Sequence, residues 1–198
     1  MDNTALFNLS YGVYVITTWG EGKATGCTAN SAMQITANPA TIAVSINHDN
    51  YTNKCIKDTG IFAVNILGEN VDPIIIGSFG FRSGKDVDKF EGIEPLVKEF
   101  TPVLPQAISY ITCKVINTME TETHTVFLGQ VTDAGHLSKD TPMTYSYYHK
   151  VVKGTTPKNA PTYKGDLVLY KYICRVDIYV YSNTTRKDHC ILQWSFLD

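Results

Sequence analysis

The sequence has no excess of charge of either sign and no long apolar run. Its 198 residues carry 17 Lys and Arg against 19 Asp and Glu, which gives a formal net charge of −2. This balance excludes the basic footprint typical of nucleic-acid binding. No segment approaches the ~20 apolar residues that span a bilayer, and the first residues lack the pattern of a secretion signal. We therefore expect a cytoplasmic protein that binds neither nucleic acid nor membrane.

Motifs for several common chemistries are also missing. The five cysteines are scattered and form no CxxC pair, so we expect reduced thiols, with no disulfide framework and no zinc site. The sequence contains no GxxxxGK[ST] phosphate loop and no GxGxxG, GxSxG or HExxH motif. It therefore predicts no metal site, no Rossmann nicotinamide domain and no catalytic dyad of side chains.

What is present reads mostly as β-sheet. The segment 11–18 is apolar on both faces, and two glycines at 19–23 predict a hairpin after it. Residues 49–58 predict a short helix, whereas 71–79 fit a helix or a strand. Further β-branched and aromatic runs predict strands from about residue 24 and at 41–47, 61–67, 109–118 and 124–132. At least six strands with few helices predict a mainly β protein, a closed or partly closed barrel.

Three stretches of small and polar residues are candidates for ligand contact. GCTANS at 26–31 has short side chains, which let a backbone come close to a flat ligand. SINHDNYT at 45–52 ends a strand and opens a helix, whose free N–H groups suit a phosphate. RSGKDVDK at 82–89 supplies three cations for an anion. For each stretch, the alternative is an ordinary polar turn at the end of a strand.

The order of these stretches resembles the flavin reductase-like, FMN-binding split-barrel family. The similarity covers roughly residues 1–163, and it is greatest to the flavin reductase part of high-molecular-weight rubredoxins and to flavoredoxin. The resemblance implies a six-stranded Greek-key split barrel with short helices, a homodimer, and FMN bound near the subunit interface. The motifs that carry it are ALFNLSYGVYVITT, TANSAMQITANPATIAVSINHDNYT, FGFRSGKDVDKF, THTVFLGQV and YYHKVVKGTTPKNAPTY.

The resemblance also implies roles for individual residues. Along the flavin ring and the ribityl chain it places Thr28, Ala29, Asn30, Ser31, Ser45, Ile46, Asn47 and His48. Toward the phosphate and in the loop that closes over the cofactor it places Tyr51, Thr52, Ser83, Gly84 and Lys89, with Thr52 as the first choice of phosphate ligand. Arg82 is a further candidate because the phosphate needs charge-assisted donors. His149 is a candidate nicotinamide contact, and a surface histidine that caps a strand end is the alternative.

The function implied by the resemblance is that of an FMN-dependent oxidoreductase, a NAD(P)H-dependent flavin reductase. NAD(P)H gives a hydride to the bound flavin, and the electrons pass to free flavin or to a small redox protein such as rubredoxin. Positioning alone suffices for this chemistry, in line with the missing dyad. Two alternatives stay open: an FMN electron carrier without nicotinamide activity, and a flavin-free split-barrel interaction module.

The resemblance to the reductase ends after Tyr163. KYICRVDIYVY at 171–181 resembles the start of a rubredoxin domain, but Asp177 stands where the second cysteine of the CxxC knuckle is expected. Only Cys174 and Cys190 are present, and a rubredoxin iron site needs four thiolates. We therefore predict two parts: a flavin reductase-like domain at 1–163 and a degenerate rubredoxin-like tail at 164–198 without metal.

Overall fold

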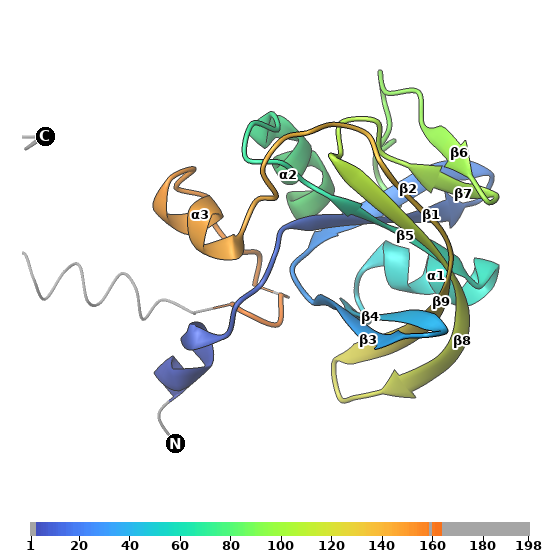
Figure 1. The fold of residues 1–198 in the computed structure, drawn as a ribbon, viewed down its shortest axis with the longest axis horizontal. Helices are drawn as coiled ribbons and strands as arrows, with labels where there is room; N and C mark the ends of the chain where they lie inside the picture. Colours follow the sequence, from blue (N-terminus) through green and yellow to red (C-terminus); the bar gives the residue numbers. More distant parts are fainter. Residues whose placement is uncertain (1–2, 159, 164–198) are drawn as a thin grey trace, which may run out of the picture. The chain divides into compact units, whose positions relative to one another are not determined.

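The computed structural model describes residues 3–158 and 160–163, which are mainly β (Figure 1). The strands are β1 (Tyr14–Gly20), β2 (Lys23–Ala29), β3 (Ala32–Ala37), β4 (Ala40–Asn47), β5 (Ile61–Ile66), β6 (Leu96–Lys98), β7 (Thr101–Val103), β8 (Ser109–Glu120) and β9 (His124–His136). The helices are the 3-10 helix η1 (Asn3–Asn8) and the α-helices α1 (Tyr51–Thr59), α2 (Pro73–Phe81) and α3 (Tyr145–Lys150). The predicted tail at 164–198 lies outside the described residues and stays a prediction.

Seven strands form one antiparallel sheet in the order β2-β1-β5-β8-β9-β4-β3, and β6 pairs with β7 in a separate hairpin. The strands β2 and β3 follow each other in the chain, yet they lie at opposite edges of the sheet. The barrel is therefore split between them, and the chain crosses this split through Asn30 and Ser31. The predicted class, a mainly β split barrel, is confirmed.

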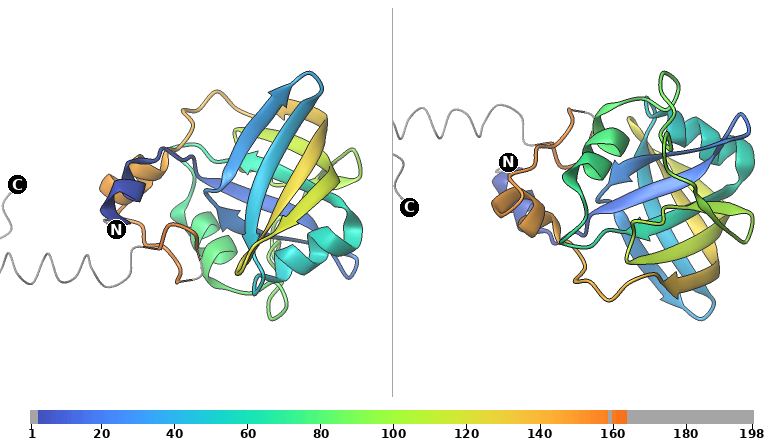
Figure 2. Two further views of the ribbon diagram at one scale, coloured as in Figure 1. Left: turned by 90° about the horizontal axis from the view of Figure 1, so that it is seen from below. Right: turned by 90° about the horizontal axis from the view of Figure 1, so that it is seen from above.

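The strand count differs from the six expected, and β3 is the reason in the main sheet. Every residue of β3 after Ala32 is exposed, so burial imposes no alternation of apolar and polar residues on its sequence. The β6 and β7 strands have three residues each, which is too short for a recognisable pattern. Figure 2 shows β3 at the outer edge of the sheet, beside β4.

The helices α1 and α2 each begin at a side-chain cap. At α1, Asn50 Oδ1 accepts a hydrogen bond from the backbone N–H of Thr52, and the helix ends at Gly60 with φ 70°, a conformation that favours glycine. At α2, Asp72 Oδ1 accepts from the N–H of Ile74 at 2.9 Å. The helix predicted at 49–58 is therefore confirmed, and the ambiguous segment 71–79 is helical because Asp72 and Pro73 start a helix there.

The strand β1 separates two hydrophobic clusters, which explains its apolar residues on both faces. Ile16 packs inside the barrel with Phe62 and Phe127, and α1 contributes Ile56 to the same cluster. On the other face, Val15 belongs to a cluster that α2 and α3 complete with side chains such as Phe79 and Tyr148. The helices α2 and α3 accordingly lie at the same end of the barrel (Figure 2).

Within the described residues, the longest helices have nine residues, and none is long and apolar enough to cross a membrane.

Candidate functional site

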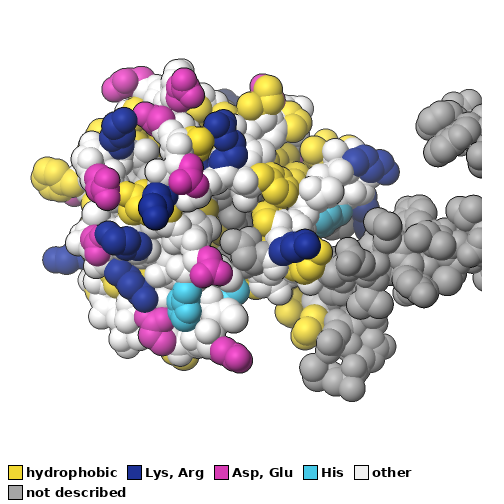
Figure 3. Space-filling model, turned by 180° about the vertical axis from the view of Figure 1, so that it is seen from behind, with side chains coloured by type: hydrophobic (Ala, Val, Ile, Leu, Met, Phe, Trp, Pro, Cys, Tyr) yellow, Lys and Arg dark blue, Asp and Glu magenta, His cyan; other side chains and the backbone are white. Residues whose placement is uncertain are grey.

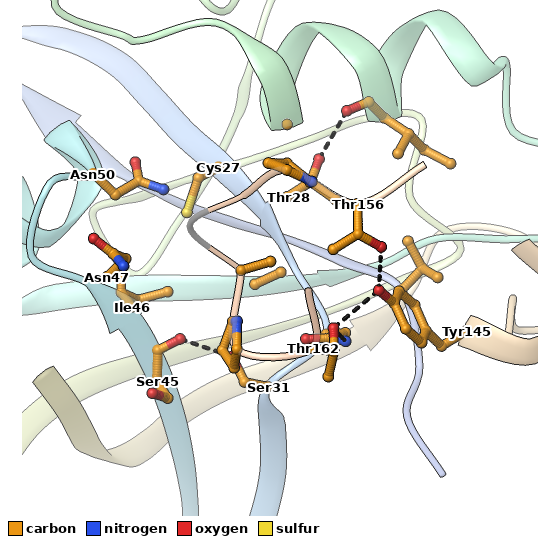
Figure 4. Close-up of a pocket in the computed structure, with 18 of the residues that line it drawn as sticks. Cys27, Thr28, Ser31, Ser45, Ile46, Asn47, Asn50, Tyr145, Thr156 and Thr162 are labelled. Carbon is orange, nitrogen blue, oxygen red and sulfur yellow. Dashed lines mark hydrogen bonds between the residues drawn. The ribbon is translucent and has the colours of Figure 1, made fainter. Parts of the chain in front are cut away.

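A pocket of about 700 Å³ lies where the chain crosses the split in the barrel. Its walls include the end of β2 and the link to β3, namely Cys27, Thr28, Ala29, Asn30 and Ser31, together with the end of β4, namely Ser45, Ile46 and Asn47. Ile76 and Gly80 of α2 and Tyr145 and Tyr148 of α3 line it as well. Two of the stretches selected from the sequence therefore meet in one place (Figure 4).

Hydrogen bonds fix these walls to one another. Ser31 binds the end of β4 twice, because its hydroxyl donates to the carbonyl of Ser45 at 2.7 Å and its own carbonyl accepts from the N–H of Ser45 at 3.0 Å. Thr28 Oγ1 donates to the carbonyl of Ile76 in α2 at 3.1 Å. Gly80 faces Thr28, and a side chain at position 80 would come within 3.5 Å of it. The pocket is thus a built feature with small side chains on its sheet wall.

A second pocket of about 950 Å³ adjoins the first and shares part of its wall. The common residues are Asn50, Gly80, Phe81, Thr156 and Pro157. The second pocket adds Tyr51 at the start of α1, Arg82 and Ser83 at the end of α2, and Lys158. Two cations against the single carboxylate of Asp49 favour an anionic group here.

Ten of the residues predicted to bind the cofactor therefore line one of these two pockets. The first holds Thr28, Ala29, Asn30, Ser31, Ser45, Ile46 and Asn47, and the second holds Tyr51, Arg82 and Ser83. The structure does not bring His48, Thr52, Gly84 and Lys89 to either wall.

The predicted phosphate ligand Lys89 instead holds the end of a helix. Its ammonium donates to the backbone carbonyls of Ser78 (2.6 Å), Phe79 (3.3 Å) and Arg82, and its side chain is only 5% exposed. Burial lowers the pKa of Lys89 to about 8. The last carbonyls of an α-helix have no partner within the helix, so this cation satisfies them.

The other three predicted residues are also engaged by the protein itself. Thr52 is buried in the first turn of α1 against Cys27. Gly84 packs against Thr25 and Tyr51, and a side chain at position 84 would overlap the hydroxyl of Thr25. His48 points to the surface, where its Nε2 lies 2.9 Å from Oε2 of Glu120.

His149, the candidate nicotinamide contact, lies behind the pocket wall rather than in it. Its Nδ1 is 2.9 Å from the carbonyl oxygen of Gly154, and its ring contacts the edge of Tyr145 with centroids 4.3 Å apart. It belongs to α3, so the alternative of a histidine that caps a strand end does not describe it either.

Sequence reasoning missed one side of the first pocket, which residues 155–157 and 160–162 of the segment 155–162 form. Its members in the wall are Thr155, Thr156, Pro157, Ala160, Pro161 and Thr162. Thr162 is tied to Asn30 and to Tyr145 by hydrogen bonds of 2.8 and 2.9 Å. The segment shows no regular alternation of apolar and polar residues. Its signal in the sequence was the family motif that contains it, YYHKVVKGTTPKNAPTY.

Two titratable groups in the first pocket are electrically neutral near pH 7. Burial raises the pKa of Cys27 to about 11, against the opposing effect of its hydrogen bond with Thr52. Burial, followed by the nearby His48, lowers the pKa of His124. The Nε2 atom of His124 is buried with no hydrogen-bond partner among the described residues, and His124 lines the pocket. A bound ligand with a polar edge is the kind of partner that satisfies such an atom.

The fold and these pockets define a class of protein. Residues 6–156, more than half of the chain, match the model of the flavin reductase like domain. The protein therefore belongs to the flavin reductase-like family, as predicted.

Particular relatives narrow this further. The chain is 41% identical over 190 residues to the high molecular weight rubredoxin of Moorella thermoacetica, covering 91% of this chain and 83% of the relative. It is 37% identical over 165 residues to the ferric-chelate reductase (NAD(P)H) of Archaeoglobus fulgidus, covering 82% and 98%. The crystal structure of flavoredoxin from Methanosarcina acetivorans matches with TM-score 0.61 and 26% identity, over 66% of this chain and 69% of that one. The predicted likeness to the first and third of these proteins is confirmed.

Proposed function

We propose that this protein is an FMN-dependent oxidoreductase that takes a hydride from NAD(P)H and passes the electrons to an acceptor. The predicted enzyme class and cofactors are confirmed at the level of the family: the chain is a flavin reductase-like protein, and its Archaeoglobus relative is named as a reductase that uses NAD(P)H. The observation that carries the detailed proposal is the pair of adjoining pockets, one with slim walls and one with cations.

The first pocket suits the flat isoalloxazine ring. Thr28, Ala29 and Ser31 leave room for a ring beside the backbone, and Gly80 keeps the facing side of α2 thin. The unpartnered Nε2 of His124 offers a hydrogen bond to a polar ring edge.

The second pocket suits the phosphate. Arg82 and Lys158 supply positive charge, Ser83 supplies a hydroxyl, and the N-terminus of α1 opens into the same space at Asn50 and Tyr51. A phosphate gains from unpaired backbone N–H groups and from the partial positive charge at a helix N-terminus. Bound there, FMN supplies an acceptor for hydride and a donor of single electrons.

The chain's own contribution is binding and orientation. The described pockets contain no pair of side chains with the geometry of a nucleophile and its base, so we assign the residues above to positioning the flavin and the nicotinamide. The electron acceptor in our proposal is free flavin or a small redox protein such as rubredoxin. The Moorella relative supports the second choice, because its match covers 91% of this chain and so extends past residue 163.

We further propose a homodimer, built on an apolar sheet face that borders the first pocket. Residues directly opposed in neighbouring strands share a face of the sheet, and this pairing puts Ser45 of β4 and Met119 of β8 on one face. Met33 of β3 lies on the same face, because it opposes Ala43, two residues before Ser45. Met33 is 64% exposed and Met119 is 59% exposed. Because Ser45 also lines the pocket, a partner subunit on this face would lie next to the flavin.

The cytoplasmic location predicted from the sequence is part of the same proposal. Cys27, Cys55 and Cys113 are buried free thiols, which fits a reducing compartment. Charged side chains of both signs are mixed over the face drawn in Figure 3, which fits a protein without a basic nucleic-acid surface.

Absorption spectroscopy of the full-length protein tests the flavin proposal. We expect a yellow protein, or a colourless one that takes up FMN, whose visible flavin absorption bleaches rapidly after mixing with NADH or NADPH. Bound FMN that bleaches only with a reduced redox protein would identify an electron carrier instead. Failure to take up FMN would leave the split barrel as an interaction module.

Two matched substitutions test the dimer. Met33→Glu places a charge on the proposed interface, and Val97→Glu makes the same change at an exposed residue of β6. We expect light scattering to show a dimer for the natural protein and Val97→Glu, and a dissociation constant raised at least tenfold for Met33→Glu. Equal masses for all three proteins would place the interface elsewhere or exclude a dimer.

A further inference from the structure

A series of hydroxyl groups runs along the wall of the first pocket that the 155–162 segment forms. Asn30 Nδ2 donates to Thr162 Oγ1 at 2.8 Å, and Thr162 Oγ1 donates to Tyr145 Oη at 2.9 Å. The phenol oxygen lies 2.5 Å from Thr156 Oγ1. All four residues line the pocket, and Figure 4 shows Tyr145 between the two threonines.

The series continues to an imidazole outside the pocket. Thr156 Oγ1 lies 3.4 Å from Nε2 of His149, and Nδ1 of His149 lies 2.9 Å from the carbonyl oxygen of Gly154. The side chains of Tyr145, Thr156, Thr162 and His149 are all half-buried, and His149 is the one of the four that does not line the pocket. The series therefore joins the pocket to a titratable group outside its wall.

The two ends of the series fix the direction of every hydrogen bond in it. The amide nitrogen of Asn30 only donates, and the carbonyl of Gly154 only accepts. Nδ1 of the neutral imidazole therefore carries the proton and Nε2 accepts. Each hydroxyl has one proton, so Thr162 donates to Tyr145, Tyr145 donates to Thr156, and Thr156 donates to His149.

We propose that Thr162, Tyr145, Thr156 and His149 form a proton relay that carries a proton from the first pocket to the imidazole of His149. This inference rests on the proposed function. With flavin bound, one NAD(P)H delivers two electrons as a hydride, and when two one-electron acceptors have each taken one electron, one proton is left in the pocket.

The relay moves that proton by exchanging O–H bonds. A proton binds Thr162 Oγ1 while the proton already there moves to Tyr145 Oη. The phenol proton moves to Thr156 Oγ1, and the threonine proton moves to Nε2 of His149. The net change is one positive charge transferred from the pocket to the imidazolium of His149. The cycle closes when the Nε2–H bond breaks, that proton passes to buffer, and the three hydroxyls turn back.

Ring packing holds the side chain of Tyr145 in place independently of its hydroxyl. A variant that lacks only the hydroxyl should therefore keep the ring in position. The ring contacts Tyr11 and His149 edge-on, with centroids 6.1 and 4.3 Å apart, and stacks on Tyr148 at 6.3 Å. Tyr145→Phe keeps these contacts and removes the proton that the relay needs. Among the contacts that the structure describes, two titratable groups, Tyr145 and Tyr148, lie against the imidazole of His149.

The first experiment uses the flavin-free full-length protein and NMR. Protonation of His149 at Nε2 forces the Thr156 hydroxyl to turn, so we expect the Tyr145 Cζ resonance to follow the titration of His149. Thr156→Val should abolish this coupling, whereas Thr155→Val should keep it, because the bond that Thr155 accepts from Tyr148 uses its backbone carbonyl. A Tyr145 resonance that ignores the His149 titration would overturn the relay.

The second experiment uses protein saturated with FMN and reduced with NADH, then mixed with ferricyanide in weak buffer. We expect Tyr145→Phe and His149→Gln to slow reoxidation at least tenfold, and added imidazole to restore the rate of His149→Gln but not of Tyr145→Phe. Restoration by a small base is not expected from a structural role. Unchanged rates in both variants would overturn the relay and leave the proposed function intact. Failure to bind FMN would overturn the proposed function, and the NMR experiment would then decide the coupling alone.

Discussion

The loop that follows α2 carries two cations with opposite surroundings. Arg82 is exposed at the wall of the second pocket, whereas Lys89 is buried and donates to three carbonyls at the end of α2. The sequence presents both residues as equivalent partners for an anion. The comparison shows that a cation in a polar loop can bind the ligand only if backbone carbonyls do not already bind it.

Removal of Lys89 should give the largest effect. Lys89→Ala leaves buried carbonyls of α2 without a donor, so we expect the free energy of unfolding to fall by about 2–4 kcal/mol. Urea denaturation of the flavin-free protein measures it. Lys85→Ala, an exposed lysine of the same loop, should change stability by less than about 0.5 kcal/mol. Unchanged stability together with lost FMN affinity would restore Lys89 as a phosphate ligand.

Removal of Arg82 should weaken ligand binding and leave the stability of the fold unchanged. We expect Arg82→Ala to weaken FMN binding roughly tenfold, about 1.4 kcal/mol, because a charged donor to the phosphate is lost. Fluorescence titration measures the affinity. Riboflavin, which has the same ring and no phosphate, should bind the natural protein and the variant equally. An equal loss for both ligands would mean that Arg82 does not contact the phosphate.

A pH dependence that Lys89 alone should contribute gives a further test of its burial. Burial lowers the pKa of Lys89 in the folded protein to about 8, against 10.5 for an ordinary lysine. Between these values the unfolded chain holds a proton that the folded protein has released, so the stability due to this group rises with pH.

The difference in unfolding free energy between the natural protein and Lys89→Met isolates this contribution. It should be constant below about pH 8 and rise from there to about pH 10.5. Urea denaturation across this range measures it. A difference that falls in this window would show that the folded protein holds the proton more tightly than the unfolded chain.

The fold and the sheet wall of the pocket were predictable for physical reasons. Buried strands need apolar residues, and β1 needs them on both faces because it separates two cores. The ends of β2 and β4 were recognisable because small polar residues interrupt those runs. By contrast, β3 is exposed along most of its length and carries no such pattern.

The remaining part of the site depends on tertiary contacts that a sequence does not display. In the sequence, His124 does not differ from any isolated histidine. Only the structure shows that its Nε2 is buried beside the pocket. The sequence also did not show that Thr52 and Lys89 are buried. Thr52 lies against Cys27, and Lys89 binds carbonyls at the end of α2. The segment 155–162 lacks periodicity, so its place in the wall follows from hydrogen bonds to Tyr145 and Asn30.

The link of Asn30 and Ser31 has a consequence for how this molecule tolerates change. The same two residues turn the chain across the gap between the sheet edges and furnish part of the pocket wall. An insertion there would widen the gap and displace the Ser31–Ser45 bonds at once. Architecture and ligand fit are therefore inseparable at this point of the chain.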